Sequence, residues 1–356
     1  MGSNELERWV AVVSGGYHPS GDPNDHASYS ATATEGRSIW VLDMETGIPL
    51  AERKFDTAGN CANPAAAVNT TAERQMCFAL SATPAVYDSD GDGFADVIYA
   101  GDLGGNMWKW VIKDPLQLSD ATTASTPATD WPFRKWFSAP IYPTSGSPQY
   151  YKSIFFPPAG TKKNGKVWIA FGTGERNDLL YMSDATTPDD NNRFYVVEDT
   201  DIFEQGAPAQ SLIGESNLTN LTNTSTCGSV GNKGYYLVGS EGEKWVTNVD
   251  IFVGYVIANS YVPQPSTDPC EIGGLAYLWA FKVECGQGLF TDASGNPDRT
   301  LDLGAGLPTD PRVTVGANGD TSNRLIISKQ GGDIINIDAP PGFPGSGMFY
   351  WRELLK

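Results

Sequence analysis

Short apolar runs alternate with turns along most of the chain. The runs are rich in Val, Ile, Tyr, Trp and Phe, and Gly, Asp, Asn and Pro bound them, which is typical of β-strands. Eight stretches have this character: "WVAVVSGG", "SIWVLDMETG", "DVIYAGDLGGNMWKWVI", "KVWIAFGTGE", "RFYVVED", "GYVIANSYV", "LAYLWAFKVE" and "RLIISKQGGDIINID". A sustained period of 3.6 residues is nearly absent, so helix is expected only in a few turns, for example at Pro115–Ser119. The pattern predicts an all-β fold.

Several of these stretches repeat one unit, in which a strand, a Gly-rich turn and a second strand ending in Asp follow one another. Copies begin near residues 9, 96, 166, 251 and 325, with irregular spacing. Such weak self-similarity with variable insertions is expected when each copy is one blade of a β-propeller. At roughly 40–50 residues per blade, the chain would hold about seven. We therefore predict a modified β-propeller with long inserted loops; the alternative, a pair of β-sandwich domains, lacks a linker to divide it.

Two long polar segments, Thr57–Gln75 and Phe203–Lys233, fit no blade. We expect both to be inserted surface loops, which serve either recognition or only as solvated connections. Residues 1–8 contain "MGS" and no apolar run, and we expect them to be a tag or linker preceding a single domain of residues 9–356. No run of 18 apolar residues occurs, so no membrane span is predicted.

The charge and the cysteines narrow the possible partners and compartment. The net charge is −18, with 24 Lys and Arg and no basic cluster, which disfavours binding to nucleic acid. None of the five cysteines forms a CxxC pair, so a zinc site is not expected. A disulfide between Cys61 and Cys77 would close a loop and contribute about 3 kcal/mol, and free buried thiols are the alternative. Composition and cysteines together suit an exported protein, with one cysteine left over.

The stretch "DSDGDGFAD" concentrates like charge more tightly than any other part of the chain. Counted from Asp88, it has acids at positions 1, 3, 5 and 9 and Gly93 at position 6. In a calcium loop these positions supply side-chain oxygens, position 7 supplies its backbone carbonyl, and the glycine makes the sharp turn. The predicted Ca²⁺ ligands are Asp88, Asp90, Asp92, the backbone carbonyl of Phe94, and Asp96.

One departure from the helical EF-hand is informative. Position 12 is Tyr99 instead of the bidentate Glu, and the flanking segments are strand-like. We therefore expect a strand–loop–strand site whose shell is completed by water or by a residue from elsewhere, with micromolar or weaker affinity. The alternative is a solvated acidic turn, in which four unneutralised carboxylates would raise one another's pKa values. Magnesium fits less well because it requires rigid octahedral geometry.

Other acidic spots and possible catalytic groups give weaker signals. Ordinary solvated turns are expected in "SGDPNDH", with Asp22, Asn24 and Asp25, and in "PDDNNR", with Asp189 and Asp190, and Asp102 is expected to cap its own turn. The two histidines, His18 and His26, lie in one polar insert, and no nucleophile elbow, HExxH or phosphate-loop motif occurs. "GTGERND" lacks a following helix, so it is not a phosphate cradle. No enzyme activity is predicted, although a carboxylate pair for glycoside hydrolysis stays open.

The stretch "ATPAVYDSDGDGFADVIYAGDLGGNMWKW" resembles the signature of the PilY/PilC family of type IV pilus proteins. In that family an aspartate-rich calcium loop runs into a Gly-Asp-Leu-Gly-Gly-Asn turn. Further similarity lies in "SIWVLDMETG", "AFGTGERND", "GGLAYLWAF" and the terminal "YWREL". The combined loop and "GDLGGN" turn is specific, whereas the other fragments alone would be weak.

The resemblance implies the C-terminal, modified β-propeller domain of a larger exported protein at the bacterial outer surface or pilus tip, or in the periplasm or outer membrane. Calcium on the five ligands would then regulate pilus extension and retraction, and with them twitching motility and adhesion. The implied partners are major or minor pilins and a host-cell or abiotic surface. Two alternatives stay open: an enzyme of the quinone-dependent dehydrogenase type, because "LDMETG"-like turns occur there too, and an integrin-α-like adhesive propeller, whose calcium loop is repeated in several blades.

Overall fold

The computed structural model describes residues 8–64, 66–112, 131–142, 149–180, 190–204, 211–231, 233–264, 273–314, 324–329 and 332–338. Within these ranges the chain is almost entirely β, as the pattern predicts, with three single-turn 3₁₀ helices, η1 (Pro19–Gly21), η2 (Glu73–Gln75) and η3 (Glu215–Asn217). The helix predicted at Pro115–Ser119 lies outside the described residues, as do Asp189, Cys270 and the terminal "YWREL".

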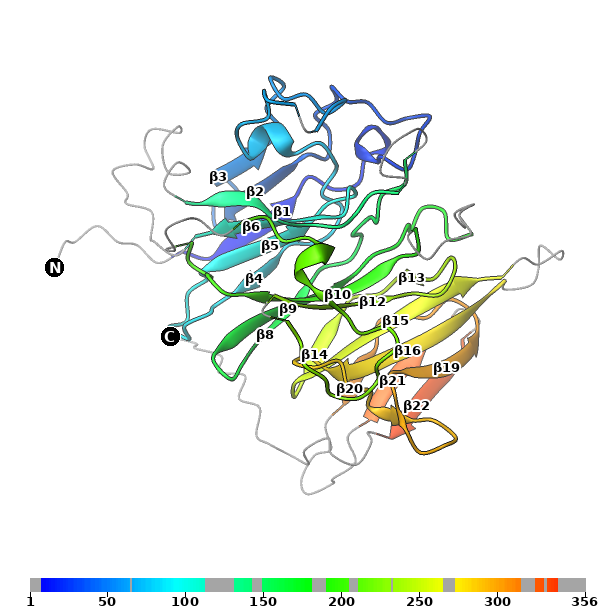
Figure 1. The fold of residues 1–356 in the computed structure, drawn as a ribbon. Helices are drawn as coiled ribbons and strands as arrows, with labels where there is room; N and C mark the ends of the chain where they lie inside the picture. The colour runs from blue at the N-terminus through cyan, green and yellow to red at the C-terminus, as the bar shows by residue number, and fades with distance from the viewer. Residues whose placement is uncertain are drawn as a thin grey trace.

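Five sheets of three or more strands follow one another along the chain, from the blue to the red end of Figure 1. The first sheet contains β1 (Val10–Ser14), β2 (Ser38–Asp43) and β3 (Pro49–Lys54), and the second contains β4 (Ala85–Tyr87), β5 (Val97–Gly101), β6 (Asn106–Val111) and β7 (Phe133–Ser138). The third has the order β11 (Thr219–Asn220), β12 (Gly234–Val238), β10 (Arg193–Asp199), β9 (Lys166–Gly172) and β8 (Ala159–Lys163).

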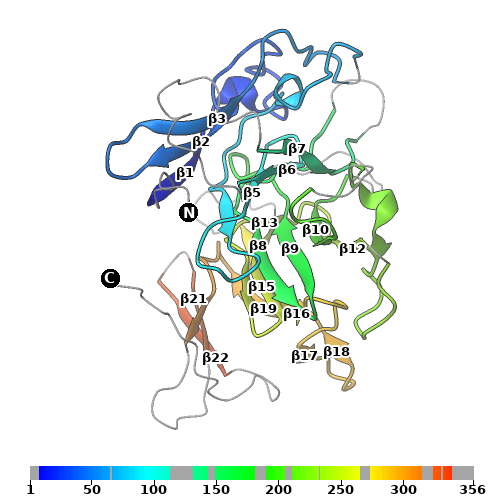
Figure 2. The ribbon, with the colours of Figure 1, turned by 90° about the vertical axis from the view of Figure 1, so that its left-hand side faces the viewer.

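The fourth sheet has the order β13 (Lys244–Trp245), β15 (Tyr255–Pro263), β16 (Gly274–Lys282) and β19 (Thr300–Ala305), with β14 (Asp250–Phe252) also paired to β15. The fifth contains β20 (Arg312–Thr314), β21 (Arg324–Ser328) and β22 (Ile334–Asp338). A small hairpin of β17 (Phe290–Thr291) and β18 (Pro297–Asp298) lies beside β16 in Figure 2. The described residues thus account for five of the about seven blades that the length predicts.

All eight predicted stretches form strands, and the repeated unit is an antiparallel pair in each case. β1 pairs with β2, β5 with β6, β9 with β10, β15 with β16 and β21 with β22. Sequence reasoning missed β3, "PLAERK", and β8, "AGTKK", which lie at sheet edges. Because edge strands face water on one side, they tolerate charged residues and lose the apolar signal on which strand prediction rests.

The strands of the middle sheets are buried on both faces because consecutive residues enter different cores. In β5, Ile98 and Ala100 pack with the first sheet, whereas Val97 and Tyr99 pack with the third. A third core lies between the third and fourth sheets, and a fourth joins the fourth sheet to Leu325 of β21. This face-to-face succession of sheets is the packing of propeller blades, since each sheet needs a neighbour to cover its apolar face.

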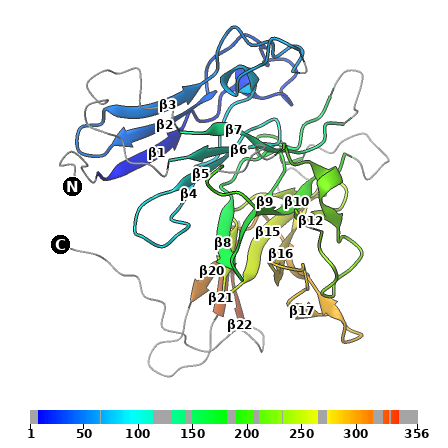
Figure 3. The ribbon, with the colours of Figure 1, turned by 60° about the vertical axis from the view of Figure 1, so that its left-hand side comes forward.

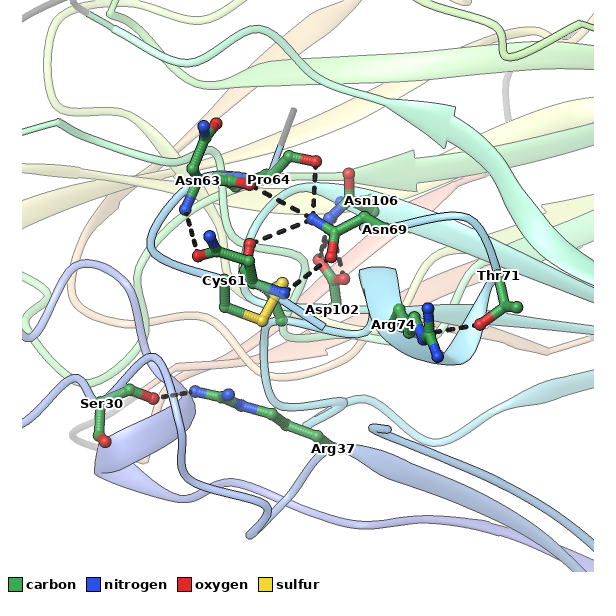
Figure 4. Close-up of a disulfide and its surroundings, with 12 residues drawn as sticks. Ser30, Arg37, Cys61, Asn63, Pro64, Asn69, Thr71, Arg74, Asp102 and Asn106 are labelled. Carbon is green, nitrogen blue, oxygen red and sulfur yellow. Dashed lines mark hydrogen bonds between the residues drawn. A yellow bond between two sulfur atoms is a disulfide. The ribbon is translucent and has the colours of Figure 1, made fainter. Parts of the chain in front are cut away.

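The two inserted segments are more structured than solvated loops. The disulfide Cys61–Cys77 clips the first one, and the Asn69 side chain donates hydrogen bonds to the carbonyls of Asn63 and Pro64 within it (Figure 4). The expectation of a free surface loop was wrong for part of Phe203–Lys233. There β11 adds a parallel strand to the third sheet, and Cys227 is bonded to Cys285 beyond β16.

Candidate metal centre

The aspartate-rich loop joins two neighbouring strands of the second sheet. β4 ends at Tyr87 and β5 begins at Val97, and these two residues face each other in an antiparallel pair. Figure 3 shows this cyan loop extending away from the sheets between β4 and β5. The predicted strand–loop–strand arrangement is therefore the observed one, and the loop's two ends are held together by the sheet.

Three of the predicted ligand side chains converge. Carboxylate oxygens of Asp88, Asp90 and Asp96 lie within 4.8 Å of one another. Asp88 and Asp90 are exposed, whereas Asp96 is only 2% exposed. A cation placed among these oxygens would therefore rest on a buried carboxylate and remain open to water on the opposite side.

Backbone amides of the loop fix the carboxylates in place. Asp88 accepts hydrogen bonds from the amides of Gly91, at 2.6 Å, and Gly93, at 2.8 Å. Both glycines have left-handed φ angles, 84° and 94°, which other residues rarely adopt. The glycines thus wind the chain around the carboxylates, which explains why an alternation of Asp and Gly occurs here.

Asp96 forms the base of the loop, and its position comes from Ser89. One Asp96 oxygen accepts the Ser89 amide at 2.7 Å and the Ser89 hydroxyl at 2.6 Å. The Asp92 carboxylate accepts the Phe94 amide at 2.9 Å and is not part of the converging group. The Phe94 ring is exposed. The structure therefore brings together three of the four predicted carboxylates.

The loop is connected to the third sheet as well as to its own. The Lys162 ammonium of β8 donates to the Ser89 carbonyl at 2.9 Å, and the Tyr87 hydroxyl donates to the Pro158 carbonyl. Tyr99 of β5 donates to Asp199, which also forms a fully buried ion pair with Lys109. A change in the loop would therefore act on the boundary between two sheets.

The donor set suits a hard divalent cation. Carboxylate oxygens are the ligands that Ca²⁺ prefers, and its flexible shell of six to eight oxygens tolerates added water or carbonyl groups. Within the described residues no other group of acidic, histidine or cysteine side chains gathers in this way. No helix of the described part is long and apolar enough to cross a membrane.

The minor acidic spots have different outcomes. Asp102 caps its own turn, as expected, by accepting the amides of Gly104 and Asn106 at 2.9 Å each. The expectation of an ordinary solvated turn was wrong for Asp22 and Asn24. Asp22 is 2% exposed, and the Asn24 side chain binds Glu175 at 3.2 Å. No local pattern could have shown this, because the two partners are 151 positions apart.

Comparison with known proteins identifies the family. Residues 8–220, more than half of the chain, match the model of the PilY1 β-propeller domain. The type IV pilus biogenesis factor PilY1 homologue of Xylella fastidiosa is 22% identical over 76% of this chain, and PilY1 of Pseudomonas aeruginosa is 27% identical over 67%. The matches cover only 22% and 19% of those relatives.

A solved structure agrees with the fold. The C-terminal domain of Pseudomonas aeruginosa PilY1 superposes with a TM-score of 0.54 at 17% identity, covering 84% of this chain and 66% of that domain. The face-to-face packing of the sheets and the match of residues 8–220 to the family model agree with each other. The chain belongs to the PilY1 β-propeller domain family.

Proposed function

We propose that this chain is a calcium-binding, non-enzymatic domain of a type IV pilus biogenesis factor, and that calcium on the aspartate loop regulates pilus extension and retraction. The observation that carries the calcium assignment is the convergence of Asp88, Asp90 and Asp96. Asp92 and the Phe94 carbonyl would complete the protein's share of the shell after a small movement of the loop.

The link to the pilus comes from the relatives, which are type IV pilus biogenesis factors. In this proposal the domain is exported, contacts major or minor pilins, and contributes to twitching motility and attachment to host-cell or abiotic surfaces. Calcium would neutralise the carboxylates and hold the loop in one conformation. Lys162 and Tyr87 connect the loop to the third sheet through hydrogen bonds. Binding of calcium to the loop would therefore also change the protein surface that contacts a pilin.

Isothermal titration with calcium tests the metal assignment directly. Asp88→Ala and Asp90→Ala remove exposed ligands, so both variants should fold and lose at least tenfold in affinity. Asp292→Asn is the matched control, because Asp292 is an exposed turn residue of the β17–β18 hairpin that caps its own loop amides. Parental affinity in both alanine variants would remove the site from Asp88–Asp96.

The pilus assignment needs a separate measurement. In a bacterium that lacks its own PilY1, the full-length protein carrying this domain should restore surface pili and twitching. The same protein with Asp90→Ala should assemble pili whose retraction no longer responds to chelation of calcium. If the two proteins respond alike, calcium on this loop has no role in retraction, whatever the titration shows.

A further inference from the structure

Two segments that the metal centre does not use meet where three sheets adjoin. One is "SGDPNDH", in the insert between β1 and β2, and the other is "GTGERND", which follows β9. Asn24 from the first segment connects them. Its side-chain nitrogen lies 2.9 Å from the Tyr151 carbonyl, 3.0 Å from the Ser153 hydroxyl and 3.2 Å from the Glu175 carboxylate. Its side-chain oxygen accepts the Tyr151 amide at 2.8 Å.

Asn24 thus joins the insert of the first sheet to the segment between the second and third sheets and to the end of β9. We call this set of contacts the Asn24 clasp: Asn24 with Tyr151, Ser153 and Glu175. Because the Asn24 side chain hydrogen-bonds to these parts of the chain, a change in its position would alter how the three sheets pack together.

Two buried carboxylates flank the clasp and face one cavity. Asp22 is 2% exposed and accepts the Asn24 amide at 3.0 Å, and Glu175, 9% exposed, accepts the Asn24 side chain. Neither has a salt-bridge partner in the part of the chain that the structure describes. The cavity beside them has a volume of about 290 Å³, and its lining also includes Tyr17, Asp25, Tyr150, Asn177 and Asp178.

Two like charges in a buried site repel each other, and burial disfavours the ionised form of both. Burial, and then the charge of Asp22, raise the pKa of Glu175 to about 7, against the hydrogen bonds from Asn177 and Asn24, which favour the ionised form. Burial also raises the pKa of Asp22, against the hydrogen bonds from Asn24 and Asp25 that lower it. Protonation of one of the two carboxylates therefore removes the repulsion, and Glu175 is the group that takes the proton.

The groups around Glu175 do not neutralise it. Acidic or phenolic groups face Glu175 from the insert between β1 and β2, from the segment after β7 and from its own turn. Its charged or titratable neighbours are Tyr17, Asp22, Asp25, His26, Tyr150, Lys152, Asp178, Asp190 and Lys244. Lys244 is a cation that acts on Glu175, and burial lowers the pKa of Lys244 to about 8. Its influence on Glu175 is smaller than that of burial and of Asp22.

We infer that the Asn24 clasp is a proton-controlled contact: it is held closed most firmly while Asp22 and Glu175 together carry one proton, and its opening becomes easier when both are ionised. Opening separates the insert between β1 and β2 from the segment around Tyr151. It requires no metal and does not depend on the aspartate loop, so this inference stands or falls independently of the proposed function.

The sign of the effect follows from the bound proton. The closed clasp holds the proton more tightly than the opened one, in which Glu175 meets water and returns to its ordinary value of 4.5. Opening is therefore favoured as pH rises from 4.5 toward 7, and the gain levels off above that. Linkage with these values gives about a tenfold increase in the opening constant between about pH 6 and pH 8.

Hydrogen–deuterium exchange of the intact chain tests the inference, with labelling times adjusted for the intrinsic pH dependence of exchange. The reporter is the peptide containing the Tyr151 amide, which Asn24 protects. Relative to a core peptide of β9, its exchange should rise about tenfold between pH 6 and pH 8. Glu175→Gln keeps the shape and one of the two acceptor oxygens but cannot ionise, so its protection should not change between pH 6 and pH 8.

Glu241→Gln is the matched control, because it makes the same substitution at a glutamate that is exposed to solvent. It should follow the parent. Asp22→Asn provides a second arm, since removing the like charge should shift the rise to lower pH. The inference is overturned if the parent shows no rise, or if Glu175→Gln shows the same rise. Should Glu175→Gln lose protection in β9 as well, an unshifted rise in Asp22→Asn overturns it.

Discussion

The molecule has two groups of carboxylates that solve the same electrostatic problem in opposite ways. The aspartate loop collects its acids from nine consecutive residues, leaves Asp88 and Asp90 exposed, and wraps them in its own amides. The second group lies at the Asn24 clasp, where Asp22 and Glu175 come from distant parts of the chain and are both buried beside Asn24.

Solvent access explains why the two groups suit different ligands. An exposed loop on two paired strands can admit a cation of calcium's size together with its remaining waters. A buried pair bridged by one amide offers no comparable shell, and a single proton removes most of its repulsion. The comparison shows that the number of acids is a poor guide to what neutralises them, whereas burial and the position of the backbone amides are better ones.

The largest expected effect comes from replacing Asn24, the central residue of the Asn24 clasp. Asn24→Ala removes the contacts to Tyr151, Ser153 and Glu175, so that the Tyr151 amide and one Glu175 oxygen lose the hydrogen bonds that Asn24 makes with them. We expect the free energy of unfolding, measured with urea, to fall by about 3 kcal/mol. The control is Asn296→Ala in the exposed β17–β18 turn, which should lower it by less than about 0.5 kcal/mol. If Asn24→Ala and Asn296→Ala lowered the free energy of unfolding equally, the Asn24 clasp would be an ordinary surface contact.

Calcium should stabilise the loop by a slightly smaller amount. At a free concentration of about 100 times the dissociation constant, binding to the folded state alone adds about 2.7 kcal/mol to the free energy of unfolding. Thermal unfolding with and without a chelator measures the change, and Asp88→Ala, which should bind at least tenfold more weakly, should lower it by at least about 1.3 kcal/mol. An equal increase in Asp88→Ala would place the bound calcium elsewhere in the chain.

The third effect concerns pH. Because the folded state raises the pKa of Glu175 to about 7, the parent should lose stability as pH rises from 4.5 to about 7. Glu175→Gln should therefore gain about 2 kcal/mol in stability relative to the parent between pH 5.5 and pH 8. Chemical unfolding at the two pH values measures the difference. A constant difference at both values would mean that packing, and not ionisation, distinguishes the variant.

The two regions also mark what sequence reasoning can reach. The aspartate loop was predictable because its chemistry is local: acids at alternate positions, glycines at the turns, and strands on both sides. The all-β fold was predictable for the same reason, since strands such as β5 and β9 carry their own apolar signal. Edge strands such as β8 were missed because water, and not a core, faces one of their sides.

The Asn24 clasp could not be predicted because nothing in "SGDPNDH" differs from an ordinary turn. Only the stacking of the sheets brings Asn24 to Glu175, and burial then changes the pKa of groups that would otherwise titrate normally. Similarly, the Phe203–Lys233 segment has the composition of a solvated loop, yet β11 pairs with β12 through backbone groups that composition does not report.

The smallest expected effect separates the two groups most cleanly, because added salt screens exposed charges far more than buried ones. The Debye length falls from roughly 10 Å at 0.1 M salt to roughly 3 Å at 1 M. Calcium affinity at the exposed Asp88 and Asp90 should weaken by about fivefold over this range. The pH midpoint for opening of the Asn24 clasp should move by less than about 0.3, since Asp22 and Glu175 interact away from the solvent. Calorimetry and hydrogen exchange in the same two buffers measure the calcium affinity and the pH midpoint. A midpoint shift of about 0.7, which is equivalent to the fivefold change in affinity, would mean that Glu175 is exposed in solution.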